Sequence, residues 1–424
     1  MYFYITLGKG LVMKMLQYEL KKIFLKPVNR AMLVLLLAIV LIGSFLAIRD
    51  VKYYRGDHPE LSGPLAAREL KKVQKQWEGP VTGDVLRRVV KENKAINDSA
   101  ESADIGFAKK QGFADLINLI CVAFSEPGKY DPYMCDSISP DKAAKLYERR
   151  VSRLEKEISE LETGLPGAFS EKEQRYLVRQ YKNLKTPLYY EYAEGWKALL
   201  DSQYLPTLMI IIIVIIGFLV SGIFSDEFQL KADSIFFSSK LGRNKAILSK
   251  IKAGLLAITI LYWSAMLLFS AIILGTLGIG GAGCMVQLSF SNWECMYNIT
   301  YFQEWLLCMF GGYIGNLFIL TLAMFVSAKS RSAVLSIAVP FVLSCVPMFL
   351  GRVPVLADFM SYFPDMLLRI NKFLGDFVFC EIGGTVFGVY TVLIPCYLLL
   401  SLVLFPMIYY GYKKMGAVPA RAGQ

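Results

Sequence analysis

Six long runs of apolar residues dominate the pattern of hydrophobic and polar positions along the chain. They fall at 31–48, 205–224, about 253–280, 305–327, 333–350 and about 385–410. A run of roughly 18 or more apolar residues is long enough to cross about 30 Å of hydrocarbon as a helix. The pattern therefore predicts an all-α membrane protein with six transmembrane helices, the last four within 253–410.

The segments between these runs differ in charge, and the difference predicts an orientation. Segments 1–30, 225–252, 328–332 and 411–424 together carry 17 Lys and Arg against four acids, whereas 281–303 carries no Lys or Arg. Basic residues collect on the cytoplasmic side of membrane proteins. Both termini are therefore expected in the cytoplasm, and the net charge of +11 is a topology signal that does not indicate nucleic-acid binding.

The long polar segment 49–204 is expected to be an extracytoplasmic helical domain inserted between the first two spans. Its clearest helical pattern starts at Pro140, with Ser139 as the N-cap. Apolar residues then recur at 3-4 spacing: Ala144, Tyr147, Val151, Leu154, Ile158 and Leu161. Two shorter patterns run through Ala66, Leu70, Val73 and Trp77, and through Phe113, Leu116 or Ile117, Ile120 and Phe124. Such seams favour a small helical bundle.

The N-terminal segment 1–30 contains an amphipathic stretch over residues 15–28. Leu16, Leu20, Ile23 and Phe24 recur at helical spacing, and Pro27 ends the stretch before the first span. This helix is expected to lie in the inner membrane interface; the alternative is a basic flank that only anchors the first span. Met15 is as good a candidate as Met1 for the natural start.

The cytoplasmic segment 225–252 has an amphipathic helical pattern, which a simple loop between two spans would not need. Its first half places four apolar residues on one helical face: Phe228, Ala232, Ile235 and Phe236. Aromatic residues at the end of this helix, Phe236 and Phe237, are expected to be exposed, and Gly242 breaks the helix. Exposed apolar residues mark partner sites, so the segment is interpreted as a docking element; the alternative is a helix lying flat on lipid.

Several motifs together carry a family resemblance. They are MLQYELKKIF from Met15, WKALL before the second span, FSDEF, SSKLGRNKAILSKIKA and the C-terminal YYGYKKM. With the order of six spans, they resemble the permease subunits of ABC-2-type exporters, in particular Gram-positive bacterial members with a large outer loop. The resemblance covers most of the membrane part and is weak in 49–204.

The resemblance implies that segment 225–252 holds a coupling helix that docks on a separate ATP-binding subunit, with the N-terminal helix beside it. The implied ATPase-coupling residues are Glu227, Phe228, Ile235, Phe236, Lys240, Gly242 and Arg243. It also implies an outer re-entrant segment near 356–373, interrupted by Pro364, and a location in the bacterial plasma membrane. A second permease subunit, identical or different, would complete the pathway for a hydrophobic or amphipathic substrate.

Missing motifs separate this hypothesis from its rivals. The sequence has no G-x-x-x-x-G-K-[ST] phosphate loop, so ATP is expected to be bound by the partner subunit, and the chain is not expected to be an enzyme. One His and no C-x-x-C pair argue against a metal or catalytic centre. The alternative function is a membrane-anchored sensor or immunity protein whose outer helical domain binds a peptide.

Two smaller features leave alternatives open. Cys284 and Cys295 fall in the same outer segment and are candidates for a disulfide. Gly311 and Gly315 form a G-x-x-x-G pair, which either lets helices approach each other closely or occurs by chance.

Overall fold

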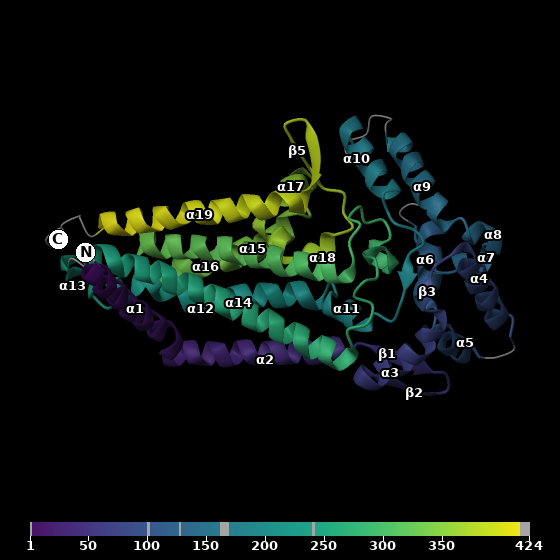
Figure 1. The fold of residues 1–424 in the computed structure, drawn as a ribbon, viewed down its shortest axis with the longest axis horizontal. Coiled ribbons are helices and arrows are strands. Elements are labelled where there is room, and N and C mark those ends of the chain that lie inside the picture. Colours follow the sequence, from purple (N-terminus) through teal and green to yellow (C-terminus); the bar gives the residue numbers. More distant parts are fainter. Residues whose placement is uncertain (1, 100–101, 127–128, 162–168, 240–241, 416–424) are drawn as a thin grey trace.

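The computed structural model describes residues 2–99, 102–126, 129–161, 169–239 and 242–415. Its larger part is a bundle of long helices, with both termini at one end and a smaller domain at the other (Figure 1). The long helices are α2 (Pro27–Arg49), α12 (Tyr204–Gln229), α14 (Ile247–Leu277), α15 (Tyr301–Ser330), α16 (Ala333–Leu350) and α19 (Val389–Met415).

Six helices of the described residues are long and apolar enough to cross a membrane, which confirms the six predicted from the apolar runs. Each corresponds to one run, with ends shifted by a few residues. Their outward faces carry apolar side chains, such as Phe45 on α2 at 60% exposed and Leu399 on α19 at 63% exposed. Apolar surface of this kind on a helix bundle is typical of a multi-pass membrane protein.

Helix α1 (Tyr2–Leu25) crosses the terminal end of the bundle obliquely and meets α2 at Pro27 (Figure 1). Proline at the first position of α2 explains the break, because it cannot continue the preceding helix. Ile23 is buried, and Leu16, Leu20 and Phe24 pack against the same core. The apolar face of α1 therefore lies on α12 and α14.

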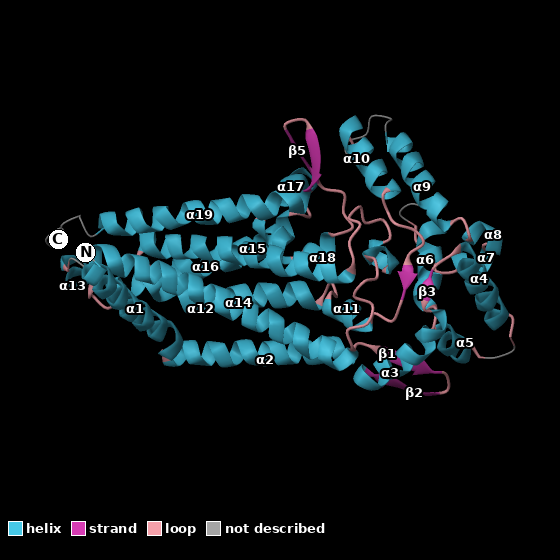
Figure 2. Ribbon diagram, in the orientation of Figure 1, coloured by secondary structure: helices cyan, strands magenta, loops and turns pink. Residues whose placement is uncertain are grey.

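Residues between α2 and α12 form the end domain. Its elements are β1 (Lys52–Arg55), β2 (His58–Ser62), α3 (Gly63–Gln74), η1 (Lys75–Trp77), β3 (Gly79–Pro80), α4 (Gly83–Asn97), α5 (Ala103–Lys110), α6 (Ala114–Phe124), α7 (Met134–Ser137), α8 (Pro140–Ala143), α9 (Leu146–Leu161), α10 (Glu171–Lys182), β4 (Tyr189–Tyr190) and α11 (Glu194–Leu199). The domain is mainly helical, but β1 pairs with β2 and β3 with β4, both antiparallel (Figure 2). These short strands were not expected.

The predicted seams supply much of the domain's core. Ala66, Leu70 and Trp77 are buried, as are Phe113, Leu116, Ile120 and Phe124. The pattern that starts at Pro140 is not one continuous helix, because α8 ends at Ala143 and α9 begins at Leu146. Ser139 does cap this region: its hydroxyl accepts a hydrogen bond from the Lys142 backbone N–H, and Pro140 follows.

A hairpin precedes α19 and packs on the end domain. It consists of β5 (Phe379–Ile382) and β6 (Thr385–Gly388), joined by Gly383 and Gly384. Both glycines have positive φ, which suits a two-residue hairpin turn. Phe379 and Val386 pack against α9 and α10 in a separate cluster with Leu154, Ile158, Leu177, Tyr181 and Met296. The helix of the sixth predicted span therefore begins at Val389, a little after the predicted start near 385.

The α14–α15 connection, with η3 (Val286–Leu288) and η4 (Phe290–Asn292), also contacts the end domain. Arg150 on α9 joins the two. Its guanidinium donates hydrogen bonds to the backbone oxygens of Cys295 at 2.9 Å, Trp293 at 3.2 Å and Tyr181 at 3.4 Å. The side chain is 4% exposed, so these carbonyl groups replace nearly all of its water.

Three short helices connect α16 to the hairpin: α17 (Pro354–Met360), η5 (Pro364–Leu368) and α18 (Ile370–Phe373). They occupy the predicted re-entrant segment and break at Pro364. The segment of η5 and α18 packs closely on α15 at Gly311 and Gly315, where the absence of a side chain leaves room for it. A Cβ at Gly311 would come within 2.4 Å of Ile370, and one at Gly315 within 3.0 Å of Leu367. The G-x-x-x-G pair thus admits this segment.

Candidate functional site

The predicted docking segment lies at the end of the bundle that holds both termini, opposite the end domain (Figure 1). Helix α12 continues to Gln229, α13 (Asp233–Ser238) follows, and η2 (Gly242–Ala246) leads into α14. Most of the expected cytoplasmic loop is therefore helical. Lys240 lies outside the described residues, and so does the side chain of Arg243.

A tight turn after α12 positions α13. Lys231 has a φ of 55°, in the left-handed region. The N–H of Ala232 donates to the Glu227 carbonyl at 2.8 Å, and that of Lys231 donates to the Phe228 carbonyl at 3.1 Å. This pair of bonds is a Schellman motif, which usually has glycine at the left-handed position. The turn satisfies two of the last carbonyls of α12 and ends that helix before α13.

Gly242 fixes the other end of α13. Its N–H donates to Ser239 Oγ at 2.9 Å. A Cβ at this position would be 1.8 Å from the Phe236 carbonyl oxygen, much closer than any real contact. The sequence interpretation of Gly242 as a helix break is consistent with this geometry, which also excludes every larger residue.

The aromatic residues of this segment face the bundle and not solvent. Phe237 is buried, Phe228 and Phe236 are half-buried, and all three rings lie within 6.0 Å of the Tyr412 ring on α19. Tyr412 also donates a hydrogen bond to the Phe224 carbonyl at 3.0 Å. The expectation that Phe236 and Phe237 form an exposed aromatic tip was wrong, because both rings pack against Tyr412.

Ile235 is the predicted docking residue that does face outward. Its side chain is 76% exposed, and that of Leu230 nearby is 78% exposed. The four residues assigned to one helical face are thus divided by the turn at Lys231, which the helical spacing did not anticipate. Ile235 and Leu230 form the apolar surface available on α13 and the turn before it.

A buried ionic cluster lies behind this surface and joins α1, α12 and α14. Lys250 Nζ is 2.6 Å from Glu227 Oε1 and 3.3 Å from Glu19 Oε2, and it also donates to the Ile223 carbonyl at 2.7 Å. Lys22 contacts Glu227 at 3.2 Å and Glu19 at 3.4 Å. Beside the cluster, Lys26 pairs with Asp226.

The cluster is internally balanced, which matters because Lys250 is 1% exposed. A buried charge is tolerated only when it is paired and hydrogen-bonded. Burial alone would lower the pKa of Lys22, but attraction by Glu19 and Glu227 outweighs it and raises that pKa above its ordinary value. Each buried charge of the cluster thus has an oppositely charged partner within 3.4 Å.

The family resemblance assigned Glu227 to coupling, but sequence reasoning missed Glu19, Lys22 and Lys250 as its partners. One signal was available: Glu19 is the only acid among the first 30 residues, and it lies on a basic amphipathic stretch. Nothing local indicated that it would meet residues more than 200 positions away.

The proposed disulfide between Cys284 and Cys295 was wrong, since both are free, buried thiols. Cys295 Sγ donates to the Leu374 carbonyl at 3.3 Å and accepts from the Tyr297 N–H at 3.4 Å. Cys284 instead lies near Glu191, and burial raises its pKa to about 12. The two thiols thus have different neighbours within the α14–α15 connection.

A second candidate site is a polar cavity of about 420 Å³ between the end domain and the α14–α15 and α16–α19 connections. Tyr130 and Phe290 meet edge to face at its wall, 4.7 Å between ring centres. Arg153 pairs with Glu294 at 2.9 Å, and burial raises the pKa of Glu294 despite this partner. Asp376 also lines the cavity, and burial raises its pKa.

Comparison with protein-family models, curated protein sequences and solved structures finds no match to this chain.

Proposed function

We propose that this chain is the permease subunit of an ABC exporter, with α13 as the helix that couples it to a separate ATP-binding subunit. One observation carries the proposal: a short helix presents exposed Ile235 at the end of the bundle while its other face is anchored to the bundle. Exposed apolar side chains on a fixed support are typical of partner sites.

Coupling requires that force on α13 reach the long helices, and two sets of contacts supply that path. Phe236 and Phe237 connect α13 to α19 through Tyr412. The Lys250–Glu227 pair connects the base of the segment to α12 and α14, and Glu19 adds α1. A displacement of α13 would thus move four helices together, and the energy would come from ATP bound by the partner.

Purification of the tagged chain from its native membranes tests the proposal. An ATP-binding protein with a phosphate-loop sequence should copurify, and the complex should hydrolyse ATP while the chain alone does not. Ile235→Glu should weaken this association by roughly thirtyfold, which corresponds to about 2 kcal/mol at an interface hot spot.

Ile279→Glu is the matched control, because Ile279 is 71% exposed at the opposite end of the bundle. It makes the same chemical change without touching α13. If no ATP-binding protein copurifies, or if both variants weaken the complex equally, the exporter proposal fails.

The cavity beside Tyr130 favours a second candidate, a membrane-anchored sensor or immunity protein that binds a peptide. Its aromatic wall and its charged lining of both signs, which includes the Arg153–Glu294 pair, Lys372 and Asp376, suit a zwitterionic ligand. Copurification with a kinase in place of an ATPase would support this alternative.

A further inference from the structure

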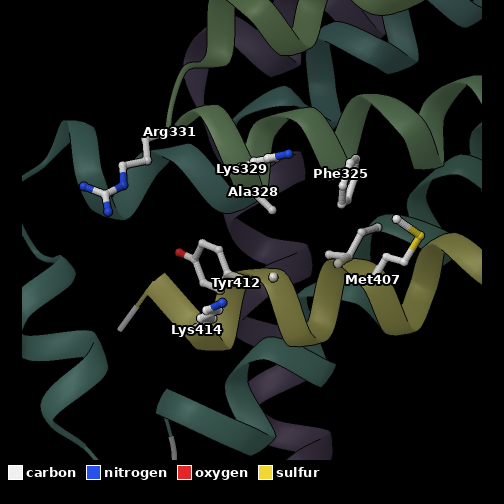
Figure 3. A pocket seen from close by; sticks show the side chains of 9 residues that line it. Phe325, Ala328, Lys329, Arg331, Met407, Tyr412 and Lys414 are labelled. Carbon is white, nitrogen blue, oxygen red and sulfur yellow. The ribbon is translucent and has the colours of Figure 1, made fainter. Parts of the chain in front are cut away.

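A pocket of about 400 Å³ lies between the terminal ends of α15 and α19 (Figure 3). Its floor is apolar: Ala328 is 2% exposed, and Ile408 and Tyr412 are fully buried. Phe325 and Met407 line the part nearer the middle of the bundle. The pocket thus continues the apolar outer surface of these two helices.

Basic side chains surround the outer part of the pocket. Lys329 and Arg331 come from the end of α15, and Lys414 from the end of α19. Figure 3 shows Arg331 on one side, Phe325 and Met407 on the other, and Lys329 between them, so basic and apolar side chains adjoin along the pocket. Among the nine described residues that line it, none is acidic.

These three cations have no acidic partner within the described part of the chain. Lysines near helix ends are common, because the last carbonyls attract positive charge. The arrangement here goes further, since Arg331 is held at φ 59°, in the left-handed region, and its guanidinium lies 4.7 Å from the Phe228 ring centre.

Gly411 leaves the space open. A Cβ at this position would meet nothing within 4 Å, although glycine costs stability inside a helix. The α15–α19 contact is the most extensive between any two elements of the described chain. An unfilled space at its end is therefore a local exception to close packing.

We propose that this pocket binds an anionic phospholipid, with the phosphate at Lys329, Arg331 and Lys414 and an acyl chain along Phe325 and Met407. Cations with an apolar neighbour match the two halves of such a lipid. Its position agrees with the orientation predicted from charge, in which this end faces the cytoplasm, where anionic lipids attract basic residues. The proposal needs only a membrane location and holds for either candidate function.

Native mass spectrometry of the full chain in detergent tests the proposal, with dioleoyl phosphatidylglycerol and dioleoyl phosphatidylcholine as competing probes. Wild-type protein should retain phosphatidylglycerol in preference to phosphatidylcholine. The triple variant K329Q/R331Q/K414Q should lower this retention by roughly a hundredfold, since each of the three basic residues near anionic lipid contributes about fivefold. Equal retention of the two lipids by wild-type protein would overturn the proposal.

The matched control is K21Q/R30Q/K252Q, which removes the same charge from exposed positions at the same end of the bundle. It should retain phosphatidylglycerol as wild type does. Equal losses in the two triple variants would mean that diffuse charge attracts the lipid, and would overturn a specific pocket.

Filling the pocket provides an independent test. Gly411→Leu should displace the lipid without changing charge, whereas Gly275→Leu should not, because a Cβ at Gly275 also meets nothing within 4 Å but lies on α14. Elution of both variants as single peaks in size exclusion confirms folding. Full retention by Gly411→Leu, or displacement of the lipid by glycerol 3-phosphate at equal concentration, would contradict the assignment to a lipid.

Discussion

Lys250 and Glu227 form an ion pair of 2.6 Å in which the lysine side chain is only 1% exposed. The pair joins two long helices at the base of α13, and Glu19 extends it to α1. Since these residues come from three separate parts of the chain, the cluster determines how the N-terminal helix and the docking segment are placed together.

Loss of one member of this cluster should be costly. Lys250→Met removes the cation and leaves Glu227 buried with Lys22 as its remaining partner, so the free energy of unfolding should fall by about 3 kcal/mol. The thermal midpoint of the purified protein in detergent measures the loss. Adding Glu227→Gln to Lys250→Met should recover part of it.

Lys252→Met is the control, because Lys252 is exposed two residues further along α14. Its effect should stay within about 0.5 kcal/mol. Equal midpoints for Lys250→Met and Lys252→Met would show that the buried pair contributes nothing to stability.

Gly242→Ala should displace α13. The added Cβ would lie 1.8 Å from the Phe236 carbonyl oxygen, so the helix and the following residues must move apart. Faster cleavage by protease within residues 230–245 measures this change. Gly283→Ala, where a Cβ meets nothing within 4 Å, should leave the cleavage pattern unchanged; similar cleavage of both variants would contradict the expected clash.

The orientation in the membrane is testable with two matched cysteine probes. Ser152 and Ser238 are both exposed, and each hydroxyl bonds only a carbonyl of its own helix. In intact cells a membrane-impermeant maleimide should label Ser152→Cys and not Ser238→Cys, because the end domain is expected outside. Labelling of Ser238→Cys alone would reverse the topology and remove α13 from the cytoplasm.

Arg150→Lys should loosen the contact between the end domain and the α14–α15 connection. Lysine keeps the charge but cannot reproduce the planar set of donors that reaches three carbonyls. We expect a loss of about 2 kcal/mol, since hydrogen bonds from charged groups contribute about 1.5–3 kcal/mol each. Arg175→Lys, at a side chain 74% exposed, should change the thermal midpoint little; an equal change in both would contradict a special role for Arg150.

The long helices could be predicted from the sequence because each depends on a continuous apolar run, as in 333–350, which matches α16 residue for residue. The hairpin before α19 was missed for a related reason. Val386 and Phe387 run directly into the apolar residues of the span, so Gly383 and Gly384 were not recognised as a turn between strands.

The arrangement of the candidate site was harder to predict, because it depends on contacts between distant residues. Helical spacing placed Phe236 and Ile235 on one face together with Phe228. In the structure the helix ends at the left-handed turn at Lys231, and Phe236 packs against Tyr412 while Ile235 is exposed. Glu19 and Lys250 are 231 residues apart. Neither carries a local pattern that indicates the other.

The three carbonyl contacts of Arg150 give the end domain a mechanical role. The α14–α15 connection is tied to α9 by that side chain, and the hairpin before α19 is held on α9 and α10 by Phe379 and Val386. The end domain thus contacts both the α14–α15 connection and the hairpin before α19, and so joins them at this end of the bundle. Any separation of these helix pairs at that end must therefore carry the domain along or expose its buried arginine, so the stability of the domain opposes such a movement.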